Sequence, residues 1–368
     1  MRRVFAGLLG SIVACGPAML REIDDDDTAA DASDEDATTT PADPDAGTIV
    51  GDDAAREAAA PLTPDKVDPN APACDDGLAV DGDIDQFLRA INLCQRTTAD
   101  DIAWGVIEAS FSRDIGRGTR APAPMQHGIL PKYGDVITPR HGSALGVLST
   151  GWAREYNGES GQKPFQEGAG SGLGVGEVPD EFGGYDADAF DLINVRLSIR
   201  VPSNARGFSF DFDFFTSEWP HYAPSEYNDR FVVWLTDSAH PNGANISFDS
   251  QNRPVSVNLG FFDRCVDGAS TGCSGSSNRT ASCPAGISEL GGTGFGLMGV
   301  GCKSEEVTKG GATGWLTTRV PAVGGEIISL EFAIWDEHDT NRDSLVLLDH
   351  FRWEADPVQN PGTTRPPS

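Results

Sequence analysis

The chain has 368 residues, of which 39% are hydrophobic, so it can bury the core of one large domain or two ordinary ones. Its formal net charge of −29 argues against nucleic-acid binding, which needs basic patches that displace phosphate counterions. The 43 glycines and 24 prolines indicate many turns and favour an all-β fold class over a helical one.

The N-terminal residues have the pattern of an export signal. Arg2 and Arg3 precede the apolar run Val4–Val13, which is long enough for a signal peptide and too short to span a bilayer. The run ends in Ile-Val-Ala-Cys-Gly, which resembles the lipobox of bacterial lipoproteins, where cleavage precedes an acylated cysteine. We therefore expect a signal peptide at 1–14 and lipidation of Cys15. The alternative is an ordinary signal peptide with an incidental cysteine.

The segment that follows is strongly acidic. From Glu22 to Asp68 there are sixteen Asp and Glu residues against one Arg and one Lys, among many Ala, Thr and Pro. Such a segment cannot bury enough apolar surface to fold. We expect a disordered, lipid-anchored spacer at 15–72, a folded domain at 73–356 and a disordered Pro/Thr tail at 357–368.

Six cysteines remain after Cys15, and an even number in an exported chain indicates disulfide bonds. A zinc site is the rival interpretation, but the sequence contains no CxxC pair. We expect each cysteine to pair with its neighbour in sequence. The predicted bonds are Cys74–Cys94, Cys265–Cys273 and Cys283–Cys302.

The patterns beyond the spacer predict one short helix followed by strands. Residues Asp83–Gln95 carry apolar side chains at helical spacing behind an acidic start, where the acids suit a helix N-terminus. Further along, short segments alternate apolar and polar residues or run apolar throughout, and turn residues separate them. The predicted strands are Trp104–Ser110, Leu145–Ser149, Ile193–Val201, Phe208–Phe214, Arg230–Leu235, Val255–Phe262, Trp315–Val320, Ile328–Trp335 and Leu345–Trp353.

This series of strands predicts an all-β domain, a β-sandwich or jelly-roll-like fold with a short N-terminal helix and long Gly-rich loops. The longest such loop is expected within 151–190, where the sequence is Gly-rich, polar and poorly patterned.

The stretch from Phe208 to Leu235 carries the first acidic cluster. Four phenylalanines at alternate positions predict a half-buried strand, and a second strand begins at Arg230. We expect these two strands to form a hairpin-like unit, with a polar loop on a rigid two-strand base. That loop contains Ser217, Glu218, Glu226, Asn228 and Asp229.

A second acidic cluster, Asp336-Glu-His-Asp-Thr-Asn-Arg-Asp-Ser344, falls between the last two predicted strands. Carboxylate and amide oxygens at this density suit a hard cation, although the glycine and final glutamate of an EF-hand are missing. If both clusters end adjacent strands, their carboxylates converge on one calcium ion. The expected ligands are Glu218, Asp229, Asp336 and Asp343, oriented by Asn228, Asp339 and Ser344. The alternative is a solvated, charged turn at each cluster.

One motif is FDFDFFTSE over 210–218 with YNDRFVVWL over 227–235, and another is AIWDEHDTNRDS over 333–344. Together they resemble the choice-of-anchor L family of bacterial exported domains. The order Leu93-Cys94, Trp104-Gly105 and Gly314-Trp-Leu-Thr317 is similar to that of its myxobacterial lipoprotein branch. The resemblance implies an extracellular β-sandwich module without an established molecular activity, with calcium as the candidate cation. It covers about residues 73–356, most of the expected domain.

These observations lead to the expectation of a lipoprotein at the outer membrane and cell surface. Its domain would be a non-enzymatic binding or adhesion module for an extracellular ligand, a glycan or a protein. It would contact the membrane through its lipid alone and would have no nucleic-acid partner. The alternative is a secreted carbohydrate-active enzyme that uses a carboxylate pair such as Glu218 with Glu226 or Asp229.

The lipid anchor can be tested by phase partitioning. We expect the wild-type protein to enter the detergent phase, because an acylated Cys15 carries apolar chains, and the Cys15→Ser variant to remain in the aqueous phase. Immunoblots of the two phases provide the measurement. Equal partitioning of the two forms would contradict a lipobox at this position.

Overall fold

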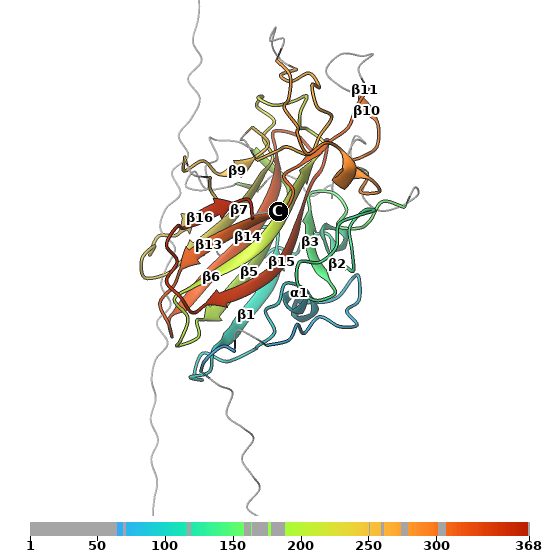
Figure 1. The fold of residues 1–368 in the computed structure, drawn as a ribbon. Coiled ribbons are helices and arrows are strands. Elements are labelled where there is room, and N and C mark those ends of the chain that lie inside the picture. The colour runs from blue at the N-terminus through green and yellow to red at the C-terminus, as the bar shows by residue number, and fades with distance from the viewer. Residues whose placement is uncertain are drawn as a thin grey trace, which may run out of the picture. The chain divides into compact units, whose positions relative to one another are not determined.

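The computed structural model describes residues 65–68, 71–115, 119–157, 163, 176–177, 188–249, 251–258, 261–273, 279–300 and 307–366. The predicted signal peptide, Cys15, most of the predicted spacer, Cys302 and much of the predicted loop at 151–190 lie outside these residues. The described part is an all-β sandwich of two antiparallel sheets, as the sequence predicts (Figure 1). No helix in this part is long and apolar enough to cross a membrane.

The first sheet contains seven of the strands that the structure describes. Its order is β1 (Gly105–Ser112), β5 (Asp188–Arg200), β14 (Ile327–Glu337), β7 (Arg230–Thr236) and β8 (Ala244–Asn245), with β4 (Gly176–Glu177) beside β5 and β9 (Val255–Ser256) beside β7. Five of the predicted strands fall in this sheet, although the one expected at Val255–Phe262 is reduced to the two residues of β9.

The second sheet also contains seven described strands. Its order is β16 (Gly362–Thr364), β13 (Leu316–Pro321), β6 (Gly207–Thr216), β15 (Ser344–Glu354), β3 (Leu145–Ser149) and β2 (His127–Leu130), with β12 (Gly311–Ala312) beside β6. A separate pair joins β10 (Gly299–Val300) to β11 (Val307–Thr308), and short 3₁₀ helices occur at η1 (Pro124–Gln126) and η3 (Ser288–Leu290).

The core between the sheets is built on the alternating phenylalanines of β6. Phe208, Phe210, Phe212 and Phe214 are all buried and face the first sheet. The ring of Phe210 meets that of Phe332 on β14 at 5.1 Å between centroids, and Phe212 meets Phe231 on β7 at 4.9 Å. Such aromatic pairs add to the hydrophobic effect of burial. The period-2 pattern therefore predicts correctly which face of β6 points inward.

The outer face of β6 differs from the prediction of a half-buried strand, because it is buried as well. A second apolar cluster covers one end of this face, where Tyr133 and Leu290 pack with Phe215 and Leu347 of the sheet. The loop between β2 and β3 is fixed there, since the Tyr133 hydroxyl donates to the Thr293 carbonyl at 2.9 Å. Periodicity within one strand carries no information on loops that later fold over it.

The expected hairpin of β6 and β7 is wrong. The two strands belong to opposite sheets, so the connection between them crosses the end of the sandwich (Figure 1). β14 and β15 are also consecutive strands in opposite sheets. The fifteen residues between the predicted strands allow such a crossing, whereas a tight hairpin needs a loop of about two to five residues.

The helix α1 (Ile84–Ala90) forms where the sequence predicts one. Asp83 is its N-cap, and its side chain accepts a hydrogen bond from the Gln86 backbone at 2.9 Å. Phe87 and Leu88 on its inner face are buried in the main core. The helix is shorter than expected because the chain turns at Asn92, which has a φ of 72°.

The folded domain extends beyond both predicted boundaries. At its start, the Val67 backbone N–H donates to the Asn204 side chain at 3.0 Å, so ordered contacts begin before residue 73. At its end, Thr363 of β16 is buried beside β13, and Arg365 donates to the Thr313 carbonyl at 2.6 Å. The prediction of a disordered tail is therefore wrong for residues up to 366, because short polar strands escape an apolar periodicity search.

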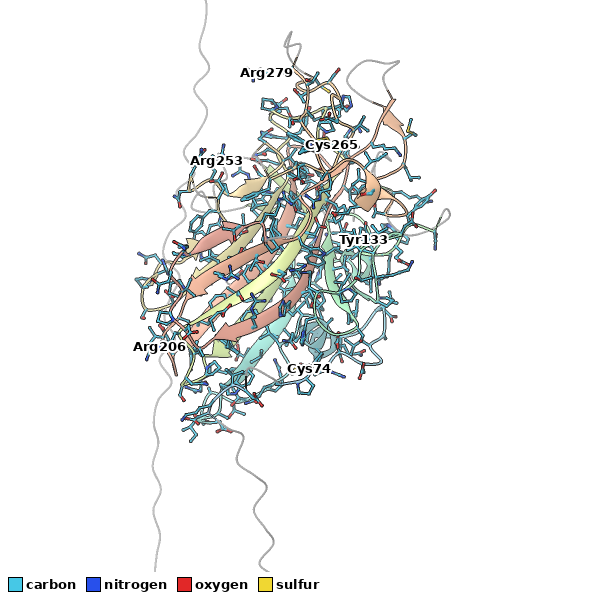
Figure 2. The ribbon with its side chains drawn as sticks, in the orientation of Figure 1. Cys74, Tyr133, Arg206, Arg253, Cys265 and Arg279 are labelled. Carbon is cyan, nitrogen blue, oxygen red and sulfur yellow. A yellow bond between two sulfur atoms is a disulfide. The ribbon has the colours of Figure 1, made fainter. Side chains whose placement is uncertain are left out.

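Two disulfide bonds fall within the described residues (Figure 2). Cys74–Cys94 forms as predicted and links the start of the domain to the end of the α1 segment. Cys265 pairs with Cys283, which contradicts the predicted Cys265–Cys273 and Cys283–Cys302 bonds. Cys273 is also disulfide-bonded. Nearness in sequence is a poor guide in this Gly/Ser-rich region, because its turns return the chain to Cys265 only eighteen residues later.

The packing of β6 predicts the effect of truncating its central ring. We expect Phe212→Ala to lower the free energy of unfolding by about 3–5 kcal/mol, because it leaves a cavity between the two sheets. Ile102→Ala is the control, because Ile102 is 80% exposed and its change should stay within about 0.5 kcal/mol. Urea unfolding followed by tryptophan fluorescence measures both. Equal values for the two variants would contradict this core.

Candidate functional site

The two acidic clusters lie side by side at one end of the sandwich. The β6–β7 connection carries the first and the β14–β15 connection the second. In the second sheet Thr216 at the end of β6 pairs with Ser344, and in the first sheet Arg230 at the start of β7 pairs with Trp335. The two connections therefore run between the same two pairs of neighbouring strands, β6 with β15 and β7 with β14, in opposite directions. The expected adjacency of the two clusters is confirmed.

Strand alternation directs these acids toward the space between the sheets. Phe231 and Ile334 are core residues on β7 and β14, and Asp229 and Asp336 lie two positions from them in sequence. Side chains two residues apart on a strand share a face. The carboxylates therefore continue the inner face of the core at the point where its apolar residues end.

All four predicted ligands are buried, with exposed fractions of 2%, 1%, 1% and 0% for Glu218, Asp229, Asp336 and Asp343. Within the described part of the chain, neither carboxylate oxygen of Asp336 has a hydrogen-bond partner, and Glu218 Oε2 also has none. Buried polar atoms are nearly always paired, and a buried charge without a partner costs several kcal/mol. These oxygens indicate that protons or a cation must neutralise the cluster.

Asp229 is the best-held member of the cluster. Its Oδ2 accepts a hydrogen bond from the Ser344 hydroxyl at 2.5 Å, and its Oδ1 accepts one from the Glu337 backbone N–H at 3.2 Å. Burial nevertheless raises its pKa to about 8, and the nearby charges of Asp339 and Glu337 add to that effect. Asp229 is therefore largely protonated at neutral pH when nothing else compensates its charge.

The pKa values of two other members are raised in the same direction. Burial raises the pKa of Glu218 well above its ordinary value, and the charges of Asp229 and Asp339 raise it further. Burial likewise raises the pKa of Asp336, with additional repulsion from Asp229 and Asp343. Each carboxylate thus acts on the ionisation of its neighbours, as expected for like charges that share one site.

The three residues expected to orient these ligands, Asn228, Asp339 and Ser344, make different contacts. Ser344 binds Asp229, as described above, which agrees with its predicted role. Asn228 accepts a hydrogen bond from the Asn258 backbone at 2.8 Å and so holds a neighbouring loop. Asp339 accepts from the Asn341 backbone at 2.8 Å and shapes its own turn. Asn228 and Asp339 therefore stabilise the connections rather than a predicted ligand.

The backbone at Gly151 lies close to the Asp343 side chain and helps to enclose it. Gly151 lies two residues after the end of β3, and a Cβ atom at this position would come within 1.9 Å of Asp343 Oδ2. The Asp343 carbonyl accepts hydrogen bonds from the Ser217 backbone and hydroxyl, both at 3.3 Å, which ties the two connections together.

A buried ion pair beside the cluster was not predicted from the sequence. Arg230 donates from Nε to one Glu337 oxygen at 3.0 Å and from its terminal nitrogen to the other at 3.2 Å. Both side chains are less than one-tenth exposed. The sequence feature that could have indicated this pair is a basic residue, Arg230, at the start of a predicted strand, together with the predicted acidic turn that contains Glu337. Glu337 is thereby neutralised by Arg230 and differs from the four carboxylates between the sheets.

The four predicted ligands can be compared with the coordination that a calcium ion requires. Oxygen-only donors and buried, unpartnered carboxylate oxygens fit a hard cation, which takes six to eight oxygen ligands at about 2.3–2.6 Å. Among the described residues, however, no group of three or more His, Cys, Asp or Glu side chains has an arrangement that could hold a metal ion. A cation here would therefore draw part of its ligands from hydroxyls, backbone carbonyls or water.

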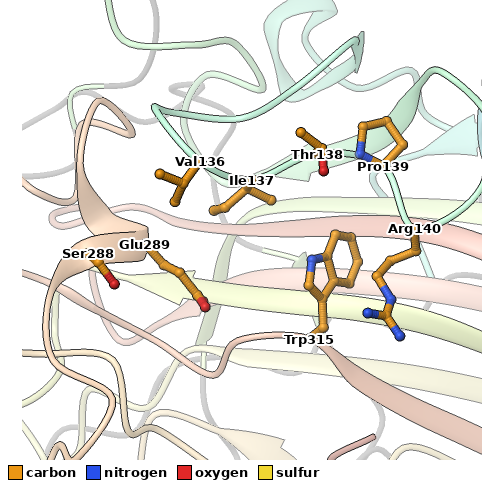
Figure 3. Close-up of a pocket in the computed structure, with 8 residues that line it drawn as sticks. All are labelled: Val136, Ile137, Thr138, Pro139, Arg140, Ser288, Glu289 and Trp315. Atoms are coloured by element: carbon orange, nitrogen blue, oxygen red, sulfur yellow. The ribbon is translucent and has the colours of Figure 1, made fainter. Parts of the chain in front are cut away.

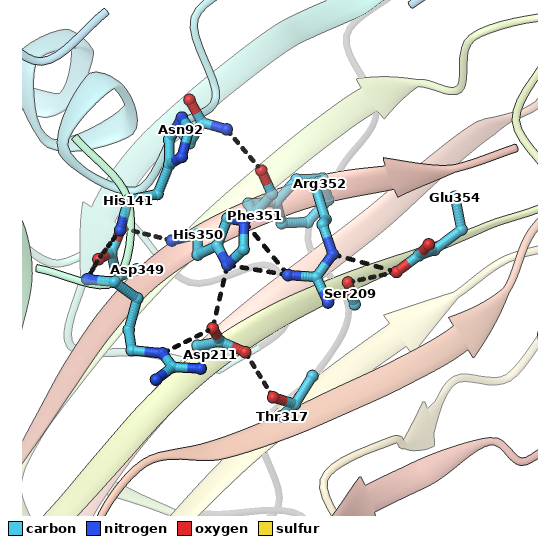
Figure 4. A network of polar contacts seen from close by, with 11 residues as sticks. Asn92, His141, Ser209, Asp211, Thr317, Asp349, His350, Phe351, Arg352 and Glu354 are labelled. Carbon is cyan, nitrogen blue, oxygen red and sulfur yellow. Dashed lines mark hydrogen bonds and ion pairs between the residues drawn. The ribbon is translucent and has the colours of Figure 1, made fainter. Parts of the chain in front are cut away.

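A second polar network, which sequence analysis also missed, lies on the outer face of β6 and β15 (Figure 4). Asp211 accepts hydrogen bonds from Thr317 Oγ1 at 2.6 Å and Arg140 Nε at 3.3 Å, and it lies 3.1 Å from His350 Nδ1. Burial would raise the pKa of Asp211, but the hydrogen bonds of His350 and Thr317 outweigh it and lower that pKa. The network joins the β2–β3 loop to the sheet.

Asp349 anchors the same loop from β15. Its side chain accepts hydrogen bonds from the backbone N–H groups of Arg140 at 2.5 Å and His141 at 3.1 Å. Burial raises its pKa to about 7, although these hydrogen bonds oppose the change. A bulge between Asp349 and Arg352, with His350 at a φ of 54°, aims these side chains outward.

Comparison with known proteins yields no family model, no curated protein and no solved structure that matches this chain. The resemblance to the choice-of-anchor L family therefore rests on its two motifs.

The raised pKa values predict a pH dependence of stability. The unfolded chain loses the Asp229 proton near the ordinary value of 3.8 and the folded chain near 8, so the folded state binds more protons between these values. Stability is then greatest below about pH 4 and is lost as pH rises toward about 8. In chelator, we expect the melting temperature to fall across this range in differential scanning calorimetry.

Asp336→Asn isolates the contribution of the cluster. The amide has nearly the same shape as the carboxylate and removes the repulsion between Asp336 and the charges of Asp229 and Asp343. In chelator, the variant should melt above the wild type near pH 8 and close to it near pH 4. Asp100→Asn, at an exposed position, is the control and should follow the wild type. A wild-type profile that rises with pH would contradict the raised pKa values.

Proposed function

We propose that this protein is an exported surface lipoprotein whose β-sandwich is a non-enzymatic, calcium-dependent binding or adhesion module. The observation that carries the calcium requirement is the pair Glu218 and Asp336, which are buried and have carboxylate oxygens without hydrogen-bond partners among the described residues. The charge of Arg342 lowers the pKa of Glu218 but does not outweigh its burial, and calcium would supply the further positive charge. Zinc or copper would favour nitrogen or sulfur ligands, and the four predicted ligands offer oxygen alone.

Each acidic residue has a distinct role in this proposal. Asp336 and Glu218 offer oxygens that are not otherwise engaged, and Asp343 stands between the Ser217 backbone and Gly151. Asp229 is held in position by Ser344 beside them, and hydroxyls, backbone carbonyls or water would supply the remaining ligands. Because these residues belong to two connections, a cation that binds them would hold the two sheets together at this end.

Export is supported by the disulfide bonds and the N-terminal pattern. Cys74–Cys94 and Cys265–Cys283 suit an oxidising compartment outside the cytoplasm. Acylation of Cys15 would hold the chain at the outer membrane, and the acidic spacer would extend the domain from that surface. Choice-of-anchor L membership is part of the proposal, since the two motifs of that resemblance cover the strand ends and connections that form the acidic site.

The alternative of a carbohydrate-active enzyme receives less support from the geometry. A general acid must approach within about 2.6–3.2 Å of its substrate. Glu218 and Asp229 are 2% and 1% exposed, so a glycoside cannot reach their carboxylates. Glu226, the other candidate in such a pair, is exposed. A buried acidic pair at the end of a core suits a structural cation better than catalysis.

Calcium should stabilise the folded protein, because it binds the native arrangement and not the unfolded chain. At a calcium concentration about 100 times its Kd, the gain in unfolding free energy is about 2.7 kcal/mol. We expect chelator to lower the melting temperature at pH 7.5 and calcium, but not an equal concentration of sodium salt, to restore it.

Asp336→Asn is the matched variant for this test as well. It removes a carboxylate that would bind calcium, so its melting temperature should respond weakly to calcium although the variant is stabilised in chelator. Asp100→Asn should retain the full wild-type response. If the wild-type melting temperature is the same in chelator and in calcium, protons alone neutralise the buried carboxylates and the calcium requirement is wrong.

A further inference from the structure

A pocket of about 550 Å³ opens on the outer face of the second sheet, away from the space between the sheets (Figure 3). The β2–β3 loop forms one wall with Val136 and Thr138, and η3 contributes Glu289 from another side. Trp315, immediately before β13, borders the pocket beside Arg140 (Figure 3). The volume lies within the roughly 300–1,000 Å³ that small-ligand sites occupy.

The walls of this pocket are fixed before any ligand arrives. The β2–β3 loop is closed by two backbone hydrogen bonds between Tyr133 and Ile137, at 2.9 and 3.2 Å, and the Asp135 backbone donates to the Gly291 carbonyl at 2.8 Å. Arg140 is held at its backbone by Asp349 and at its Nε by Asp211. A site that is already ordered loses less entropy on binding than a flexible one.

The η3 wall is fixed by charge. Arg264 Nε donates to Glu289 at 3.0 Å, and Arg264 also pairs with Asp263. Glu289 therefore keeps its position and its charge is balanced. Trp315 is partly buried and packs against the apolar cluster that contains Tyr133 and Leu290, so its indole ring is also restrained.

The lining combines an aromatic ring with groups that can donate and accept hydrogen bonds. Half of the eight lining residues are polar, so the pocket does not suit a purely apolar ligand. The two charged lining residues are each paired within the protein, Arg140 with Asp211 and Glu289 with Arg264, so neither offers an uncompensated charge to an ionic ligand. A neutral ligand with many hydroxyl groups and an apolar face matches this combination. A pyranose ring has both, because its axial C–H groups form a face that packs on an indole ring.

We propose that this pocket binds a neutral pyranose unit of an extracellular saccharide, with Trp315 as the stacking surface and Arg140 and Thr138 as hydrogen-bonding groups. The inference rests on the proposed function as a binding module and names the class of its ligand. The pocket is lined by one carboxylate, Glu289, and this is paired with Arg264. It thus lacks the two carboxylates that glycoside hydrolysis requires.

Isothermal titration calorimetry of the full-length protein tests this site directly. The probes are chitohexaose, cellohexaose, maltohexaose and mannohexaose, each in calcium. We expect saturable binding of at least one probe, a loss of at least tenfold in affinity for Trp315→Ala, and a smaller loss for Trp315→Phe, which keeps an aromatic ring. Trp104→Phe is the control, because Trp104 is a partly buried tryptophan that does not line the pocket, and it should retain wild-type affinity.

A second variant distinguishes loss of the pocket from loss of folding, because Trp315→Ala could cause either. Ser288 lines the pocket and is exposed, so Ser288→Trp should fill the pocket without disturbing the core and should abolish binding while the melting temperature is kept. Saccharide binding that survives both Ser288→Trp and Trp315→Ala would overturn the pocket while leaving a binding function intact. If no probe binds but the calcium response is present, the ligand class is wrong and the calcium proposal stands. Hydrolysis of a probe would contradict both the pocket and the non-enzymatic function.

Discussion

Repulsion among four buried carboxylates is the constraint on which this end of the domain depends. Glu218, Asp229, Asp336 and Asp343 all lie where two connections pass between the sheets, and none has more than 2% of its surface exposed. Like charges in a medium of low dielectric constant cannot all remain ionised without compensation. The raised pKa values describe one form of compensation, which is protonation. A bound cation is the other, and it would allow all the carboxylates to ionise.

The same strands build the core and the acidic site. β6 sends four phenylalanines inward and ends at the first acidic connection, and β14 places Phe332 and Ile334 in the core before it reaches Asp336. The charge state of the site is therefore linked to the packing of both sheets. Outward, β6 contributes Asp211 to the network that holds Arg140 at the edge of the pocket. One strand thus connects the core, the acidic end and the surface pocket.

Local sequence pattern predicts the elements of this fold well and their long-range partners less well. The bounds of β3 and the N-cap of α1 follow from residues within one short window. The placement of β6 and β7 in opposite sheets does not, because it depends on which strands later pair with each. The Cys265–Cys283 bond and the pairing of β16 have the same origin, since both depend on where a Gly-rich or polar segment returns to the fold.

For the acidic site, sequence identified the four buried carboxylates and Ser344 but misplaced two supporting residues. Asn228 and Asp339 are polar residues in the right connections, yet their hydrogen bonds serve neighbouring loops. Composition could not indicate that Glu337 would be matched by Arg230 across the sheet, or that Trp315 and Arg140 would border one pocket. These relations join residues more than 100 positions apart, and only the three-dimensional fold brings them together.

The central claim, that a cation neutralises the acidic end of the sandwich, is tested most directly by anomalous diffraction. Crystals of the protein grown in calcium should show an anomalous peak between the two connections, with carboxylate oxygens of Asp336 and at least one other predicted ligand about 2.3–2.6 Å away. Crystals grown in chelator should lack that peak. A map in calcium with no peak at this position, and with the carboxylates hydrogen-bonded to one another instead, would contradict the account.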